Sequence, residues 1–216
     1  LANDRDRLAR FQQEAFATSA LNHPNILTLF EVGESDSLHF ITTEHVDGET
    51  LRLRMGHRLT VREALDVAIQ VASALAAAHK AGVVHRDIKP ENIMIRHEDG
   101  IVKVLDFGLA KATERWGRSS FDPQAATLAM VNTSPGVVMG TPNYMSPEQA
   151  RGLAVDERSD IWSLGIVLYE MIANRLPFEG ETPSDVISMI LHKEPPALTR
   201  LSEEANARLD EIATKA

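Results

Sequence analysis

The 216-residue sequence contains no cysteine. This absence excludes a disulfide scaffold, a cysteine nucleophile and a thiolate metal site. Basic residues are also in short supply, because 22 Lys and Arg stand against 31 Asp and Glu and give a net charge of −9. A general nucleic-acid binder usually carries a basic surplus, so we expect no nucleic-acid partner.

Long apolar runs are absent as well. No stretch of about 20 residues is apolar enough to span a membrane. The Ala-rich stretch 64–78 comes nearest, but Glu63, Asp66 and Lys80 bracket it, as is typical of a buried helix. Residues 1–10 are charged and do not form a secretory leader. We therefore expect a cytoplasmic segment without membrane contact, while a membrane anchor elsewhere in a full-length protein stays open.

The first 46 residues predict one helix followed by a hairpin. Residues 4–21 place apolar side chains at helical spacing. Residues 26–33 and 38–46 are rich in β-branched and aromatic side chains on either side of a turn, which predicts two antiparallel strands. The segment 46–49 then has the composition of a linker.

The remainder of the chain predicts mainly helices, and the whole is of the α+β class. Thr60 followed by Glu63 is a capping-box pattern, so a long helix starts here and stops at Gly82. Short strands and loops are predicted over 83–105, and helices over 160–173, 183–193 and 203–216. Residues 109–140 have no periodicity, and a loop of this length is functional or disordered.

The most specific signal is a set of short motifs in a fixed order. Residues 85–92 read HRDIKPEN, and Asp106-Phe107-Gly108 follows fourteen residues after Asn92. Gly140-Thr141 and the sequence MSPE at 145–148 come next. In this order and at these spacings, the chain resembles a eukaryotic-type serine/threonine protein kinase domain of the kind found in bacteria. The resemblance covers essentially all 216 residues.

The resemblance implies a bilobal protein-kinase-like fold. Residues 1–46 would form an incomplete N-lobe of one helix and a hairpin. Residues 47–216 would form a mainly α-helical C-lobe that is incomplete at its C-terminal end. The activity implied is transfer of the ATP γ-phosphate to Ser or Thr hydroxyls of protein substrates.

The resemblance also assigns roles in catalysis. Phosphoryl transfer depends on positioning and charge neutralisation rather than on covalent help from the protein. Asp87 would accept or orient the proton of the substrate hydroxyl, and Lys89 would hold the transferring phosphate. Asn92 and Asp106 would supply oxygen ligands to Mg²⁺ or Mn²⁺. Thr141 would form a hydrogen bond near Asp87 and Lys89.

A second group of residues is implied to hold ATP. Glu14 would pair with the lysine that grips the ATP phosphates. Thr43 would be the gatekeeper at the end of a strand, and backbone groups of Glu44 and Val46 would bond the adenine. Met94 would form an apolar floor beneath the adenine ring.

Regulation by phosphorylation is implied by Arg86, which precedes Asp87. A phosphate carries a charge of about −1.5 to −2 and would pair with this arginine and order the long loop. The candidate sites, chosen by location alone, are Ser119, Ser120, Thr127, Thr133 and Ser134.

Two further residues have implied structural roles. Asp160 would clamp the backbone of the catalytic loop around His85 and Arg86; the alternative, an N-cap of the helix that starts there, can coexist with this role. Glu148 usually pairs with an arginine beyond the last helix, and here the chain stops first. We therefore expect Glu148 to be unpaired and partly buried, at a cost in stability.

Two parts of the family pattern are missing. The first glycine is Gly33 and the first lysine is Lys80, so no residue before Glu14 can supply the Gly-rich loop or the ATP lysine. The chain also begins with Leu1 rather than Met. We expect a piece cut at both ends that is inactive or very weak and only marginally stable.

Three hypotheses follow. The first is a piece of an active serine/threonine kinase, supported by the complete catalytic loop. The second is a non-catalytic, pseudokinase-like binding module, supported by the missing lysine and Gly-rich loop. The third is a small-molecule kinase, against which Thr141 and Ser146-Pro-Glu argue because they build a platform for peptide substrates. We favour the first.

Overall fold

The computed structural model describes residues 21–35, 38–107, 142–201 and 205–215. The helix predicted over 4–21 and the loop over 109–140 therefore lie outside the described residues, apart from Leu21. So do several of the predicted site residues: Glu14, Thr141, Ser119, Ser120, Thr127, Thr133 and Ser134.

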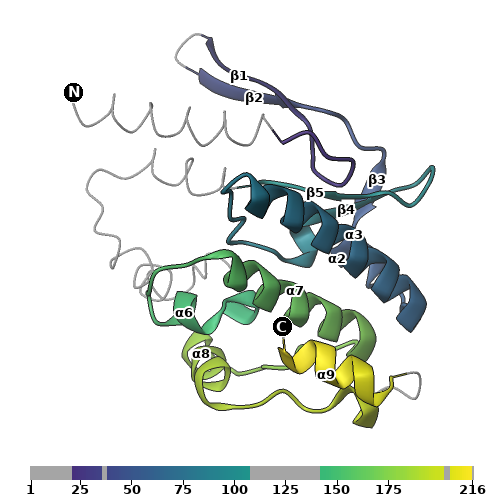
Figure 1. Ribbon diagram of the computed structural model, residues 1–216, viewed down its shortest axis with the longest axis vertical. Coiled ribbons are helices and arrows are strands. Elements are labelled where there is room, and N and C mark those ends of the chain that lie inside the picture. The colour runs from purple at the N-terminus through teal and green to yellow at the C-terminus, as the bar shows by residue number, and fades with distance from the viewer. Residues whose placement is uncertain (1–20, 36–37, 108–141, 202–204, 216) are drawn as a thin grey trace.

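The predicted hairpin is confirmed. Strands β1 (Leu29–Ser35) and β2 (Leu38–Thr43) pair antiparallel, with Leu29 opposite Thr43 and Ser35 opposite Leu38. The register shifts between Leu29 and Glu31. The hairpin forms a two-stranded ribbon at one end of the molecule (Figure 1).

A second sheet has three antiparallel strands in the order β3-β4-β5. They are β3 (Gly48–Thr50), β4 (Ile93–Arg96) and β5 (Val102–Val104). The prediction of a linker from Val46 to Glu49 is thus wrong at its end, because Gly48 pairs with Arg96. A Cβ on Gly48 would lie 2.3 Å from the Ile95 carbonyl oxygen, so the two backbones approach as only glycine allows. The segment β3 is a strand because it pairs with β4, which lies far from it in the sequence.

The long helix α3 (Val61–Lys80) starts and ends where the sequence predicts. The Thr60 side chain accepts from the Glu63 amide, and the Glu63 carboxylate accepts from the Thr60 amide, which completes the capping box. Gly82 has φ +76°, a left-handed conformation that favours glycine after a helix. Local sequence therefore sets both ends of this helix.

The remaining helices follow in the C-terminal half, apart from two short ones. They are α2 (Leu51–Arg54), α6 (Pro147–Ala150), α7 (Glu157–Ala173), α8 (Pro183–His192) and α9 (Ala207–Lys215), with 3-10 turns η1 (Pro90–Asn92), η2 (Pro142–Tyr144) and η3 (Leu198–Arg200). The helices predicted over 160–173 and 183–193 are confirmed, and the helix predicted over 203–216 is confirmed for Ala207–Lys215. Helix α7 starts earlier than predicted because Asp156 caps it.

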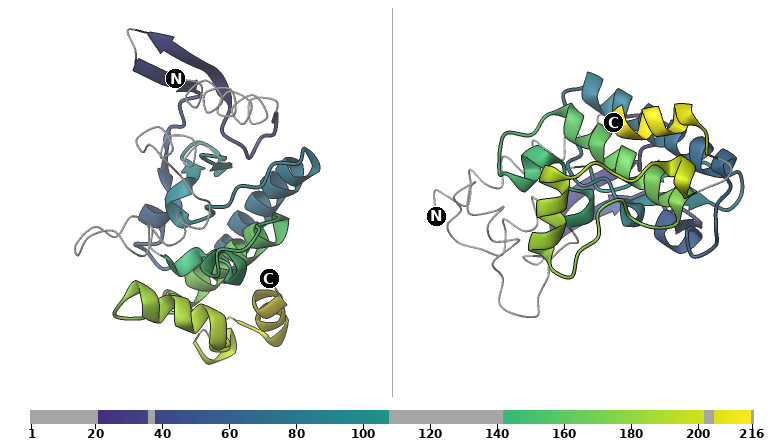
Figure 2. Two further views of the ribbon diagram at one scale, coloured as in Figure 1. Left: turned by 90° about the vertical axis from the view of Figure 1, so that its left-hand side faces the viewer. Right: turned by 90° about the horizontal axis from the view of Figure 1, so that it is seen from below.

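The core lies where α3 packs against α7 and against β5. The face of α3 that points inward carries small side chains, and Ala64, Ala74 and Ala78 are completely buried. Small side chains let a neighbouring helix approach closely. Helices α6 to α9 gather at the end of the molecule away from the hairpin (Figures 1 and 2). In the part of the chain that the structure describes, no helix is long and apolar enough to cross a membrane.

Candidate active site

The loop between α3 and β4 brings together three of the predicted catalytic residues. The Lys89 ammonium lies 2.7 Å from Oδ2 of Asp87. The Asn92 amide nitrogen donates to the same carboxylate oxygen at 3.0 Å and to the Asp87 carbonyl at 2.9 Å. The Asp87 side chain is still 45% exposed. Its carboxylate is therefore held from within the loop and open to an incoming group.

Asp106 follows β5 and lies beside this loop. The amide of the preceding Leu105 donates to the Asn92 carbonyl at 2.9 Å, which joins the two segments. Asp106 has φ +56° and Arg86 has φ +70°, both in the left-handed region. Residues other than glycine take this conformation at a cost, and such residues concentrate at functional sites. The bond between Leu105 and Asn92 thus keeps the exposed Asp106 residue next to the Asn92 end of the loop.

Asp160 clamps the catalytic loop as the resemblance implies. This side chain is completely buried, and its two oxygens accept from the His85 amide at 2.8 Å and the Arg86 amide at 2.7 Å. His79 contacts it at 2.7 Å through Nε2. The alternative role as N-cap is wrong, because the cap of α7 is Asp156.

The His85 side chain packs into the core beneath the loop and does not point toward solvent. The ring is 2% exposed and meets Phe107 edge-to-face, with ring centroids 4.7 Å apart. Burial lowers the pKa of His85 below its ordinary value, although the hydrogen bond with the Leu105 carbonyl opposes the shift. The neutral ring accepts from the Asp87 amide at Nδ1 and donates from Nε2 to Leu105. His85 is therefore a packing residue of the loop.

The segment predicted to bond adenine begins where β2 ends. Thr43 is exposed, and the Glu44 amide donates to the Thr28 carbonyl at 3.0 Å. The Glu44 carboxylate accepts from the Thr28 amide and from the Lys103 ammonium, each at 2.7 Å. Burial would raise the pKa of Glu44, but the hydrogen bonds from Lys103 and Thr28 outweigh it and lower that pKa.

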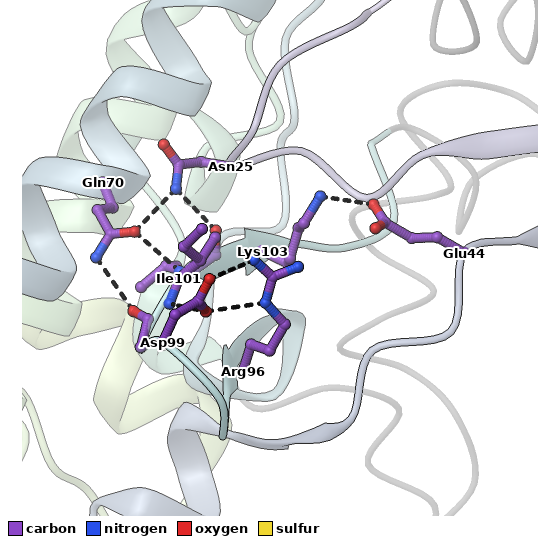
Figure 3. A network of polar contacts seen from close by, with 9 residues as sticks. Asn25, Glu44, Gln70, Arg96, Asp99, Ile101 and Lys103 are labelled. Atoms are coloured by element: carbon purple, nitrogen blue, oxygen red, sulfur yellow. Dashed lines mark hydrogen bonds and ion pairs between the residues drawn. The ribbon is translucent and has the colours of Figure 1, made fainter.

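Lys103 and the loop before β1 tie the hairpin to the rest of the molecule (Figure 3). The Lys103 side chain is only 8% exposed. The Asn25 amide nitrogen donates to Oε1 of Gln70 and to the Val102 carbonyl, each at 2.9 Å. The sequence analysis assigned a role only to the backbone of Glu44 and did not identify Lys103 or Gln70. Their partners are distant in the sequence, so no local pattern indicates these contacts.

The two other residues implied to contact adenine lie near this connection. Val46 is partly buried between β2 and β3. Met94 is partly buried on β4, the central strand of the second sheet, with Lys103 and Thr50 as its strand partners. The segment 44–46 leads into β3, and β3 pairs with β4, so these residues lie on adjoining parts of the chain. Their roles toward ATP stay predictions.

Glu148 is partly buried, as expected, but its carboxylate is not left without a hydrogen-bond partner, because a serine hydroxyl contacts it in place of an arginine. The Ser159 hydroxyl donates to its carboxylate, and Ser146 donates to Ser159 at 3.0 Å. Burial opposes ionisation, but the hydrogen bonds from Ser159, from the Glu148 amide and from Ser146 together outweigh it and lower the pKa of Glu148. A hydroxyl one turn into α7 thus satisfies the carboxylate.

The oxygen donors beside the loop suit a hard divalent cation. Asn92 turns its amide nitrogen to Asp87, which leaves its carbonyl oxygen on the opposite side of the amide. Asp106 supplies an exposed carboxylate. Among the residues that the structure describes, no three His, Asp or Glu side chains cluster as a metal site. Two ligands fit Mg²⁺, which takes one or two protein oxygens and completes its shell with phosphate and water.

The chain is similar to known protein kinases. Residues 2–215 match the family described as the protein kinase domain. The serine/threonine-protein kinase pkn3 of Myxococcus xanthus is 44% identical over 95% of this chain and 37% of its own length. PrkC of Bacillus subtilis is 39% identical over 100% of this chain and 31% of its own. The chain thus spans about a third of the length of these curated relatives.

A solved structure has the same fold. The kinase domain of PknI from Mycobacterium tuberculosis superimposes with a TM-score of 0.68 at 27% identity, over 96% of this chain and 69% of that one. The α+β kinase-like fold predicted from the sequence is confirmed. Since the family match covers nearly every residue, the chain belongs to the protein kinase domain family.

Proposed function

We propose that the protein containing this chain transfers the γ-phosphate of ATP to Ser or Thr hydroxyls of protein substrates. The observation that carries the proposal is the half-exposed Asp87 carboxylate, held by Lys89 and Asn92. Kinase-domain membership and the names of the relatives support the reaction class. We place the domain in the cytoplasm, where ATP is available.

In the proposed reaction, Asp87 receives the substrate hydroxyl. Its free carboxylate edge accepts the hydroxyl hydrogen and aims the oxygen at the phosphorus. Lys89, which rests on Asp87 here, would move its ammonium toward the phosphate and neutralise charge as that group transfers. Thr141 would support Asp87 and Lys89 from the following loop.

Asn92 and Asp106 would hold Mg²⁺ or Mn²⁺ together with ATP. The cation, when bound, neutralises charge on the phosphate oxygens. The Leu105–Asn92 hydrogen bond keeps the two ligands on one edge, so both can reach one ion. An amide oxygen from Asn92 and a carboxylate oxygen from Asp106 are ligands that such a hard cation prefers.

The adenine would lie against the segment that joins the two sheets. Backbone groups of Glu44 and Val46 would bond its edge, Met94 would lie beneath its ring and Thr43 would border it. Glu14 would pair with the lysine that holds the phosphates. Residues 1–46 would then act as the N-lobe and residues 47–216 as the C-lobe, with ATP between them.

Control by phosphorylation would act through Arg86. This residue is exposed, and its carbonyl accepts from the Gln149 amide nitrogen at 2.8 Å, which links the catalytic loop to α6. A phosphate on the loop that precedes η2 would pair with the Arg86 guanidinium. The candidate acceptors are Ser119, Ser120, Thr127, Thr133 and Ser134.

The test is phosphotransfer by the full-length protein with and without Asp87→Asn. We expect ³²P transfer from ATP to Ser/Thr peptides, reduced at least about 100-fold by the substitution, with ATP binding retained. Asp99→Asn is the matched control, because Asp99 is an exposed carboxylate on the β4–β5 turn paired with Arg96. Partner binding without any phosphotransfer by the wild-type protein would support the binding-module hypothesis instead.

A further inference from the structure

Arg52, on the short helix α2, joins three elements around the catalytic loop. Its Nε donates to Glu91 at 2.7 Å, and Nη1 donates to Glu170 of α7 at 2.7 Å. Nη2 donates to the hydroxyl of Tyr144 in η2. All three nitrogens of one guanidinium are therefore engaged, by residues 39, 118 and 92 positions away.

The inner carboxylate of this cluster is saturated by the chain itself. The Glu170 side chain is 10% exposed. One oxygen accepts from Arg52, and the other accepts from the Tyr144 hydroxyl at 2.5 Å. A buried carboxylate needs such partners because it has lost water. Burial lowers the pKa of Arg52, but the carboxylates of Glu170 and Glu91 outweigh it and raise that pKa. Arg52 therefore stays charged.

The outer carboxylate lies on the catalytic loop. Glu91 comes four residues after Asp87, next to Asn92, and its side chain is 46% exposed. An extended peptide advances about 3.3 Å per residue. Asn92, the neighbour of Glu91, bonds the Asp87 carboxylate at 3.0 Å, so a peptide whose Ser or Thr meets Asp87 passes near Glu91 within a few residues.

Two carboxylates at this place would attract a basic peptide residue if they were free. In this chain Arg52 already holds one oxygen of Glu91 and one of Glu170. An incoming guanidinium would also meet a like charge, since the Arg52 side chain is 37% exposed. Both effects weaken the attraction between this site and a positively charged substrate.

We propose that Arg52 determines peptide specificity by occupying Glu91 and Glu170, so that the kinase accepts uncharged residues near the phosphoacceptor and does not select basic ones. This inference rests on the proposed function, because it names the substrate class of the same site.

The test measures kcat/KM of the full-length protein on a peptide set. Each peptide has one Thr among alanines and a single Arg moved through the three positions on either side. For the wild type we expect no position to change kcat/KM by more than about threefold. Arg52→Ala frees the carboxylates, and Arg should then raise kcat/KM about tenfold or more at one or two positions.

Two variants show whether this gain comes from the carboxylates. Adding Glu91→Gln to Arg52→Ala should remove most of the gain, which a purely structural role of Arg52 would not produce. Arg54→Ala is the matched control on the same helix, because Arg54 pairs with Glu63 at 2.6 Å instead. Its peptide preference should equal that of the wild type.

Several results would overturn the proposal. One is a wild type that favours an Arg peptide tenfold and loses that preference with Glu91→Gln; this measurement holds even if Arg52→Ala fails to fold. Another is a folded Arg52→Ala protein with the wild-type preference. A wild type that phosphorylates no peptide at all would instead overturn the proposed function, and the specificity proposal with it.

Discussion

The catalytic loop, residues 85–92, and the β1–β2 hairpin, residues 29–43, are attached to the molecule by different kinds of contact. The loop is bound through its backbone to a completely buried carboxylate, Asp160, and through His85 to the core. The hairpin is a separate two-stranded sheet. Its links to the second sheet include the Glu44–Lys103 pair and the bond from the Leu27 amide to the Val104 carbonyl.

The catalytic loop is also more deeply buried than the hairpin. His85 and Ile88 of the loop are buried, whereas Phe30 and Phe40 of the hairpin are 67% and 38% exposed. A two-stranded ribbon gains little stability of its own. The groups proposed to act on the substrate are therefore held by Asp160 and by the core, independently of the hairpin, while the segment proposed to bond adenine depends on a few polar contacts.

The largest expected effect comes from removing the loop's anchor. Asp160→Ala leaves the buried amide of His85 and the partly buried amide of Arg86 without an acceptor, so we expect the free energy of unfolding to fall by about 3 kcal/mol or more. Urea denaturation measures this change. Asp156→Ala, which removes only the exposed cap of the same helix, should cost about 1 kcal/mol. Equal losses would show that the clamp adds nothing.

The link between hairpin and second sheet should be weaker but measurable. A double-mutant cycle of Lys103→Met and Glu44→Gln should give a coupling energy of about 1–2 kcal/mol, because the Lys103 side chain is 8% exposed. The exposed pair Arg96–Asp99 provides the control and should show a much smaller coupling that salt removes. Additive effects at Lys103 and Glu44 would mean that the pair does not secure the hairpin.

A smaller effect is expected where the chain enters the second sheet. Gly48→Ala places a methyl group against the Ile95 carbonyl oxygen, so β3 must shift away from β4, at a cost of about 1 kcal/mol or slightly more. Thermal unfolding reports the change. Glu49→Ala in the same strand should stay within about 0.5 kcal/mol. If the two variants unfold alike, the close approach at Gly48 is unimportant.

The two regions should also respond to different ranges of pH. His85 has a lowered pKa in the folded protein, so the unfolded chain binds more protons and stability falls as pH drops below 6.5. His85→Phe should remove a slope of at most about 1.4 kcal/mol per pH unit. Glu44, whose folded pKa is also lowered, contributes stability above pH 4.5 that is lost as pH falls further. An unchanged slope in the His85 variant would contradict this assignment.

Much of the secondary structure and part of the site were predictable from the sequence. Thr60 and Glu63 fixed the start of α3 because a capping box is a contact between residues three apart. Asp87, Lys89 and Asn92 lie within six residues, so their meeting needs only one tight loop. The hairpin was visible because its strands follow each other directly and carry β-branched and aromatic side chains.

Other features depend on partners that the local pattern does not indicate. Gly48 belongs to a strand only because β4 lies beside it, and Lys103 matters only because Glu44, 59 residues away, reaches its ammonium. Arg52 meets Glu170 across 118 residues. Backbone periodicity and capping act over a few residues and can be read from the chain. Ion pairs between distant segments require the packing of α3, α7 and the two sheets, so they became visible only in the folded molecule.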